Sequence, residues 1–166
     1  TEYDNTANFA SYSTYTLTLD TLGFISNNSS DTLILDEYAT LVTSKIKSNM
    51  DSRGYNFVSK NQNPDLSINA FVVNDFNVFQ TISYPSYGSG FYSSYYDYYY
   101  PIVNTYASNS AILIIQIVDL NKKNTQNQFQ VLWSCYIGDI ISSPDPFNQF
   151  GEAVDQAFAQ TPIIGK

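Results

Sequence analysis

The residues best suited to chemistry in this chain are four aspartates outside its predicted helices, namely Asp75, Asp97, Asp119 and Asp139. Two carboxyl groups held about 5 to 9.5 Å apart across a cleft hydrolyse glycosidic bonds. Asp119 and Asp139 each end a predicted strand, where a carboxylate often accepts backbone N–H bonds instead. Because a small one-sheet domain rarely frames a deep cleft, we expect no catalytic pair. A small hydrolase that uses Asp119 or Asp139 is the alternative.

Other catalytic chemistries have little basis in the sequence. It contains no histidine, and its one cysteine, Cys135, alternates with apolar residues in a predicted strand. A buried hydrophobic role suits such a cysteine, since a catalytic thiolate needs a basic partner nearby. No lysine or helix signal follows Gly88-Ser89-Gly90, so it does not make a phosphate loop. The sequence therefore predicts a protein that is not an enzyme and that needs neither a cofactor nor a metal.

Tyrosine dominates residues 83–106 as it does no other stretch of the chain. A tyrosine combines a flat apolar ring, one hydroxyl and little rotamer entropy, which suits a contact surface. The alternative is that these rings cover an exposed face of the sheet, because a loop of this length must be packed, functional or disordered. The tyrosines predicted as a possible contact surface are Tyr84, Tyr87, Tyr92, Tyr95, Tyr96, Tyr98, Tyr99 and Tyr100.

Composition narrows the class of protein. The chain has 166 residues, a net charge of −8 and only 13% charged residues, and this length favours one domain with a real core. Its seven basic residues form no single run. Nucleic-acid binding is therefore not expected, since phosphates require a clustered positive field. No window reaches the roughly 20 apolar residues of a membrane span.

Two segments have the periodicity of amphipathic helices. In residues 31–53, apolar residues recur every three or four positions, with Asp31 or Thr32 as the predicted cap and Gly54 as the stop. In residues 145–160, Asp145 followed by Pro146 is a typical helix start.

Strand patterns fill most of the remaining chain. Alternation predicts a strand within residues 3–20, and the asparagine- and serine-rich residues 25–30 predict a loop. Residues 111–120 are nearly all apolar, as in a central strand, and Gln116 and Asp119 are their polar interior positions. The other predicted strands are 55–59, 65–79 and 129–137.

These elements predict an α+β fold, in the order β-α-β-β-(Tyr-rich insertion)-β-β-α. Two one-sided helices require one sheet face, which gives a two-layer sandwich. We expect a mainly antiparallel sheet of about five strands with both helices on one face. Residues 1–166 then form a single domain, with the Tyr-rich insertion at about residues 83–108.

Several short motifs, in order, resemble a known family over nearly the whole chain. The opening segment Tyr3 to Tyr15 contains Asp4, Phe9, Tyr12 and Thr14 at the expected places. The later motifs are Arg53-Gly54-Tyr55, Pro64-Asp65-Leu66, Val118-Asp119 and Val131-Leu132-Trp133. With these motifs the chain resembles the bacterial lipoproteins of the DUF4136 family, which is defined by a domain of unknown function.

The resemblance implies a location and no chemistry. It implies a secreted protein, either periplasmic or on the cell surface. An acylated cysteine upstream of Thr1 would anchor this protein, and the outer membrane is the expected membrane. It supplies no catalytic residues. We therefore expect a non-enzymatic cell-envelope lipoprotein domain that binds or scaffolds an envelope protein or glycan. A purely structural assembly subunit is a further alternative to the hydrolase.

Overall fold

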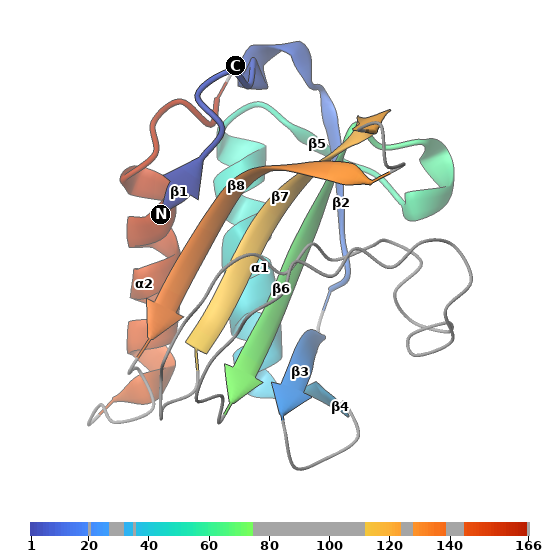
Figure 1. Cartoon of the computed structure of the whole chain (residues 1–166). Coiled ribbons are helices and arrows are strands. Elements are labelled where there is room, and N and C mark those ends of the chain that lie inside the picture. Colours follow the sequence, from blue (N-terminus) through green and yellow to red (C-terminus); the bar gives the residue numbers. More distant parts are fainter. Residues whose placement is uncertain are drawn as a thin grey trace.

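The computed structural model describes residues 1–19, 21–26, 32–34, 36–74, 112–123, 128–138 and 145–165. Its two helices are α1 (Glu37–Ser52) and α2 (Pro146–Ala159) (Figure 1). The strands are β1 (Glu2–Tyr3), β2 (Thr14–Leu17), β3 (Leu22–Ser26), β4 (Thr32–Ile34), β5 (Asn56–Phe57), β6 (Leu66–Asn74), β7 (Ile112–Lys123) and β8 (Phe129–Gly138). Neither described helix is long and apolar enough to cross a membrane.

The eight described strands form one sheet in the order β1-β8-β7-β6-β2-β5, with β3 paired to β6 and β4 paired to β3. This confirms the predicted α+β class. The expected mainly antiparallel sheet of about five strands is roughly compatible with this mixed sheet, but the details differ, because β6 pairs in parallel with both β2 and β3, and β5 pairs in parallel with β2. The physical reason is that α1 lies in the connection that returns the chain to β5 and β6, and a helical crossover makes its flanking strands parallel.

The first predicted strand, residues 3–20, is also divided differently. The structure separates it into β1, a 3-10 turn (Phe9–Ser11) and β2. The chain then continues along the same edge of β6 as β3, which overlaps the predicted loop 25–30. Between the pairs Leu17–Ile68 and Gly23–Phe71 the outer chain advances six positions and β6 three. These extra residues interrupt the strand, and simple alternation does not reveal such an interruption.

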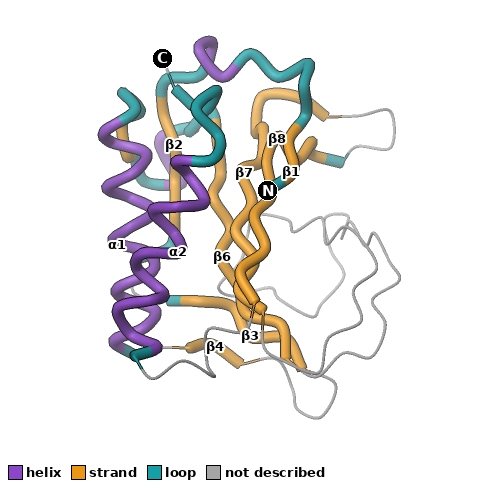
Figure 2. Tube along the Cα trace, turned by 90° about the vertical axis from the view of Figure 1, so that its left-hand side faces the viewer, coloured by secondary structure: helices purple, strands orange, loops and turns teal. Residues whose placement is uncertain are grey.

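Both helices lie on the same face of the sheet (Figure 2). Helix α1 begins later than the sequence predicts, since the side chain of Asp36 accepts hydrogen bonds from the Tyr38 and Ala39 amides at 3.0 and 3.1 Å. Thr32 instead belongs to β4, and Asp31 lies outside the described residues. The predicted stop at Gly54 is confirmed, because this residue has a φ of 87°.

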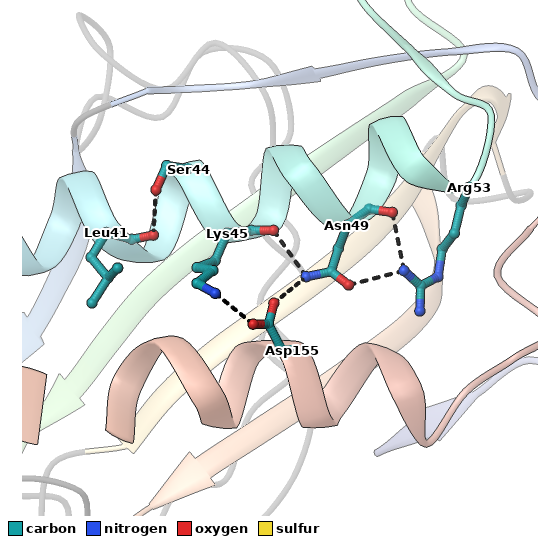
Figure 3. Close-up of polar contacts among 6 residues, drawn as sticks. All are labelled: Leu41, Ser44, Lys45, Asn49, Arg53 and Asp155. Atoms are coloured by element: carbon teal, nitrogen blue, oxygen red, sulfur yellow. Dashed lines mark hydrogen bonds and ion pairs between the residues drawn. The ribbon is translucent and has the colours of Figure 1, made fainter. Parts of the chain in front are cut away.

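Helix α2 begins as its sequence predicts. The Asp145 carboxylate accepts a hydrogen bond from the Asn148 amide at 3.3 Å, and Pro146 occupies the first turn. A polar contact joins the two helices side by side (Figure 3). Asp155 of α2 accepts hydrogen bonds from Lys45 Nζ at 2.6 Å and Asn49 Nδ2 at 2.7 Å of α1. The contact is half-exposed, so it fixes the helix pairing more than it adds stability.

The main core lies between the helices and the sheet. Trp133 of β8 packs on Phe158 of α2 with ring centroids 5.1 Å apart, and its indole N–H donates to Thr161 Oγ1 at 3.0 Å. Cys135 is buried on the same strand, and this burial raises the pKa of its thiol to about 11. The prediction that Cys135 is a buried hydrophobic residue is thereby confirmed.

Candidate functional site

The face of the sheet opposite the helices is called the outer face below. Among the described residues, it carries buried polar side chains that the sequence analysis did not predict. Because side chains alternate along a strand, the register fixes which residues share this face. Three cross-strand rows follow from the pairing of β6, β7 and β8. They are Val73–Ile112–Gly138, Phe71–Ile114–Tyr136 and Asn69–Gln116–Ser134.

The outer face is apolar at the end where β6 finishes and β7 starts. Phe71, Val73 and Ile114 form a second buried cluster, with Ile112 and Tyr136 packed against it. This cluster is separate from the core under the helices. It lies where β6 ends and β7 begins, so the sequence between these two strands, which contains the Tyr-rich insertion, starts and finishes beside it.

The middle of the outer face is polar and uncharged. We call Ser67, Asn69, Gln116 and Ser134 the polar row, since Asn69, Gln116 and Ser134 are cross-strand neighbours and Ser67 lies on the same side of β6. All four are buried; the exposed fraction is 5% for Asn69 and 1% for Gln116. Ser67 Oγ donates to Asn69 Oδ1 at 3.3 Å.

Two atoms of the polar row have no hydrogen-bond partner in the part of the chain that the structure describes. They are the Asn69 amide nitrogen Nδ2, which is a donor, and the Gln116 amide oxygen Oε1, which is an acceptor. A buried polar atom left unpaired costs about 1–3 kcal/mol. Most buried polar groups in proteins are paired, so an unpaired donor and acceptor on neighbouring strands require an explanation.

Asp119, the carboxylate most open to a catalytic interpretation, lies on the other side of the sheet in a saturated environment. It lies within β7 opposite Leu66, the first residue of β6, and its exposed fraction is 1%. The Tyr12 hydroxyl donates to its Oδ2 at 2.7 Å, and the Asn121 amide donates to its Oδ1 at 2.8 Å. Burial and this carboxylate raise the pKa of Tyr12 far above its usual value. Both oxygens of Asp119 therefore already accept hydrogen bonds from described residues.

Asp65 joins the same end of the sheet to β2. Its Oδ2 accepts bonds from the Ser13 and Thr14 amides at 2.7 and 2.9 Å, and its Oδ1 accepts from Asn121 Nδ2 at 3.0 Å. Burial disfavours the charged form, but these hydrogen bonds outweigh it and hold the pKa of Asp65 below its usual value. The signature residues Tyr12, Thr14, Asp65 and Asp119 thus form one network that ties the strand ends together.

The sequence-based site predictions divide into those the structure places and those it does not. Of the four candidate aspartates, only Asp119 is among the described residues. Asp75, Asp97 and Asp139 lie outside them, as do all eight predicted contact tyrosines, Tyr84 to Tyr100. Within the described ranges, no group of three or more histidine, cysteine, aspartate or glutamate side chains is arranged to hold a metal.

The polar row was missed by sequence reasoning, although a signal for it was present. Gln116 interrupts the apolar strand of residues 111–120. Glutamine is mostly exposed in proteins, so its presence in a buried central strand is informative. Asn69 lies in the second phase of the strand that precedes the insertion. What the sequence does not contain is the register that makes these two residues neighbours.

Comparisons with known proteins point to one family. A sequence model of the domain of unknown function DUF4136 matches residues 1–163. A crystal structure of a DUF4136 family protein from Bacteroides thetaiotaomicron is similar, with a TM-score of 0.71 and 23% identity, covering 99% of this chain and 95% of that chain. A PDZ domain protein from Parabacteroides distasonis has a TM-score of 0.53 and 15% identity, covering 97% of this chain and 34% of that one. No curated protein matches the chain.

Proposed function

This chain belongs to the DUF4136 family, a family defined by a domain of unknown function, and from that premise we propose that it is a non-enzymatic cell-envelope domain that binds or scaffolds an envelope partner. The outer face of the sheet is its binding surface. The partner is an envelope protein or glycan, and nucleic acid is not bound. The two structural likenesses support the fold alone, so the proposal depends on the chemistry of this chain.

The observation that carries the proposal is the contrast between the two sets of buried polar groups. The carboxylates of Asp65 and Asp119 each accept described hydrogen bonds on both of their oxygens. The amides of Asn69 and Gln116 keep one donor and one acceptor unpaired. Proteins tolerate such a penalty mainly where function requires it, because apolar residues of similar size would be more stable.

The Tyr-rich insertion is the second part of the proposed surface. It is inserted in the sequence between β6 and β7, the two strands that supply Asn69 and Gln116. Aromatic residues such as tyrosine dominate the binding energy of many interfaces. We assign the partner contacts to Tyr84, Tyr87, Tyr92, Tyr95, Tyr96, Tyr98, Tyr99 and Tyr100.

The proposed location is the periplasm or cell surface, with an acylated cysteine upstream of Thr1 as the lipid anchor to the outer membrane. Strand β1 pairs with β8 at one edge of the sheet, and the Thr161 hydroxyl lies 3.4 Å from that of Thr1. An anchor upstream would hold the domain by this edge. Radiolabelled palmitate should label the precursor, and fractionation should place it with the outer membrane. An unlabelled, freely soluble product would contradict the location.

Co-sedimentation with purified envelope fractions tests the binding function. We expect this chain to sediment with sacculi or outer-membrane vesicles, and a variant with Tyr95, Tyr96, Tyr98, Tyr99 and Tyr100 changed to serine to remain in the supernatant. Circular dichroism would check that the variant is folded. Failure of the unmodified chain to associate with any envelope fraction would contradict the proposal. So would turnover of an envelope substrate that is lost on Asp139→Asn, the result that the hydrolase alternative predicts.

A further inference from the structure

We infer that β1 is a displaceable edge strand, and that an extended segment of an envelope protein binds to β8 in its place. This inference rests on the proposed function and names the kind of partner and its mode of binding. It concerns the N-terminal strap, which we define as residues 1–13. The strap runs from β1 at one edge of the sheet, over the end of the sheet, to β2 (Figure 1).

The second half of the strap is firmly held. Phe9 and Tyr12 belong to the main core, with exposed fractions of 3% and 5%. The Tyr55 hydroxyl donates to the Phe9 carbonyl oxygen at 3.0 Å, and the Tyr12 hydroxyl donates to Asp119 Oδ2 at 2.7 Å. Release of this half would disrupt the core, so it is the fixed end of the strap.

The first half of the strap is held mainly by main-chain pairing. Strand β1 contains two residues, with Glu2 opposite Ser134 and Tyr3 opposite Trp133. Both side chains of β1 are exposed, and the exposed fraction of Tyr3 is 52%. Because β1 buries little apolar surface of its own, it is the kind of segment that opens locally, at a lower free energy than global unfolding.

A turn directly after β1 takes the strap away from β8. The Asp4 amide still donates to the Leu132 carbonyl oxygen at 2.8 Å, and the Asp4 carboxylate accepts a hydrogen bond from the Gln130 side chain. The Ala7 amide then donates to the Asp4 carbonyl oxygen at 3.1 Å, and the Thr6 amide donates to Asp4 Oδ1 at 2.8 Å. This turn separates the half that pairs with β8 from the half that is buried, and it is the hinge in our proposal.

The edge that β1 covers belongs to a strand of the core. Leu132, Trp133 and Cys135 of β8 are all buried. The main-chain N–H and C=O groups along a strand edge pair readily with another extended segment, and many proteins bind peptides by adding a strand in this way. Proteins protect such edges with very short strands and with charged side chains. Strand β1 has both features, since Glu2 lies within it and Asp4 follows directly.

The chemistry of a strand edge favours a protein partner over a glycan. Its N–H and C=O groups alternate at the spacing of a peptide main chain, which sugar hydroxyls do not reproduce. A partner strand of the usual five or six residues would extend along Gln130 to Ser134, whereas the two residues of β1 pair with Trp133 and Ser134 alone. The partner strand would therefore form more main-chain hydrogen bonds than the strand that it replaces.

Hydrogen exchange distinguishes a displaceable β1 from a permanent one. Main-chain groups of successive residues in a strand point to opposite sides, so Ser134, like Leu132, points to β1, while Trp133 and Cys135 point to β7. The protection factor of the Ser134 amide should be at least about tenfold lower than those of Trp133 and Cys135. Equal protection of the three amides would show that β1 opens only with the rest of the sheet, and it would overturn the inference.

A disulfide between β1 and β8 tests whether binding requires displacement. Glu2→Cys and Ser134→Cys are directly opposite on paired strands, with Cα atoms about 4.5–5.5 Å apart, which suits a disulfide. Cys135→Ala is added so that the neighbouring thiol cannot compete. The reduced form of this triple variant is the matched control, because it carries the same three substitutions without the covalent link.

Co-sedimentation with outer-membrane vesicles measures the effect on binding. We expect the reduced form to sediment with the vesicles and the oxidised form to bind at least about tenfold more weakly, because β1 can no longer leave β8. Protease treatment of the vesicles should abolish binding by the reduced form, since the partner is a protein. Circular dichroism would check that both forms are folded.

The outcomes separate this inference from the proposed function. Equal sedimentation of the oxidised and reduced forms would show that β1 stays in place during binding, so the inference would fail while the proposed function stands. Binding that survives protease treatment would overturn the protein partner and leave a glycan as the partner of the proposed function. If neither the unmodified chain nor the variant sediments with any envelope fraction, both fail.

Discussion

Tyr12 and Asp119 show how a buried carboxylate is accommodated in this protein. Asp119 is buried within β7 and has two described donors, the Tyr12 hydroxyl and the Asn121 amide. Tyr12 precedes β2, far from Asp119 in sequence, so the bond fixes the N-terminal segment against the sheet. This is a stabilising role, and it gives a structural reason for two residues of the family motifs, Tyr12 and Asp119.

Tyr12→Phe should therefore destabilise the fold. It removes only the hydroxyl that donates to a buried carboxylate, and hydrogen bonds to charged groups contribute about 1.5–3 kcal/mol. Urea unfolding at pH 7 measures the change. Tyr3→Phe is the matched control, because Tyr3 is 52% exposed, and its effect should stay within about 0.5 kcal/mol. Equal stabilities of the two variants would show that the Tyr12–Asp119 bond carries no stability.

Asp65 gives the stability a dependence on pH. Its folded-state pKa lies below the ordinary value of 3.8, because the bonds from Asn121, Ser13 and Thr14 outweigh the effect of burial. Near and below that value the unfolded chain binds protons more readily than the folded one. The stabilisation from Asp65 is therefore complete above pH of about 4 and is lost as the pH falls through the folded-state pKa.

Asp65→Asn should then be less stable than the unmodified chain at pH 7, with a gap that narrows as the pH falls below about 4. Unfolding free energies measured between pH 2 and pH 7 test this. Glu152→Gln, an exposed change on α2, is the control and should show no large gap at either end of the range. A gap for Asp65→Asn that stays constant with pH would contradict the role given to its carboxylate.

At the scale of elements, the start of α1 shows how local capping decides a boundary. Leu33, Ile34 and Leu35 precede the helix in sequence, so an apolar pattern begins before the helix does. The structure places Thr32–Ile34 in β4 and caps the helix at Asp36. Periodicity alone did not predict this boundary. The apolar residues of the strand that precedes the helix make the apolar pattern of the helix look longer than the helix is.

Asp36→Ala should lower stability by about 1 kcal/mol, within the range of about 0.5–2 kcal/mol typical of lost helix caps. The reason is that two amides, those of Tyr38 and Ala39, lose their acceptor. Thermal unfolding followed by circular dichroism measures the change. Asp36→Asn keeps a side-chain oxygen and should retain most of the stability. If both substitutions are equally harmful, capping is not the reason.

Strand pairing shows the limit of sequence reasoning more clearly. Alternation placed β6, β7 and β8 and correctly predicted the antiparallel β7–β8 pair, because the connection between these strands is short. It did not predict that β2 and β3 pair in parallel with β6. An alternating pattern shows that a strand has two faces, but it does not identify the neighbouring strand.

Prediction of the candidate site required the same missing information, namely which strands pair and in which register. Gln116 stood out as a polar residue in an apolar strand, while Asn69 looked like an ordinary polar position. The two residues are adjacent because of the β6–β7 register, and residues 75–111 separate these two strands in the sequence. The predicted tyrosine surface lies in that same stretch, outside the described residues, and so it stays a prediction.

At the scale of the whole molecule, the two faces of the sheet differ in the residues that they carry. The two helices cover one face of the sheet (Figure 2). The main core, which includes Trp133 and Phe158, lies on that face. The outer face combines a small apolar cluster with the polar row. A domain built only for stability would have apolar residues at Asn69 and Gln116, and the proposed binding function explains why it does not.

The most direct test of this claim is the unfolding free energy of the ligand-free double variant Asn69→Leu, Gln116→Met, measured in urea beside the unmodified chain and Gln156→Met. Each unpaired buried atom costs about 1–3 kcal/mol, and the double variant removes two such atoms while it takes the acceptor of one buried hydroxyl, that of Ser67. The double variant should therefore be more stable by about 1 kcal/mol, and the control Gln156→Met, an exposed change on α2, should change little. A double variant that is less stable by at least about 1 kcal/mol would show that the two amides hold the fold together, and it would contradict a site reserved for a ligand.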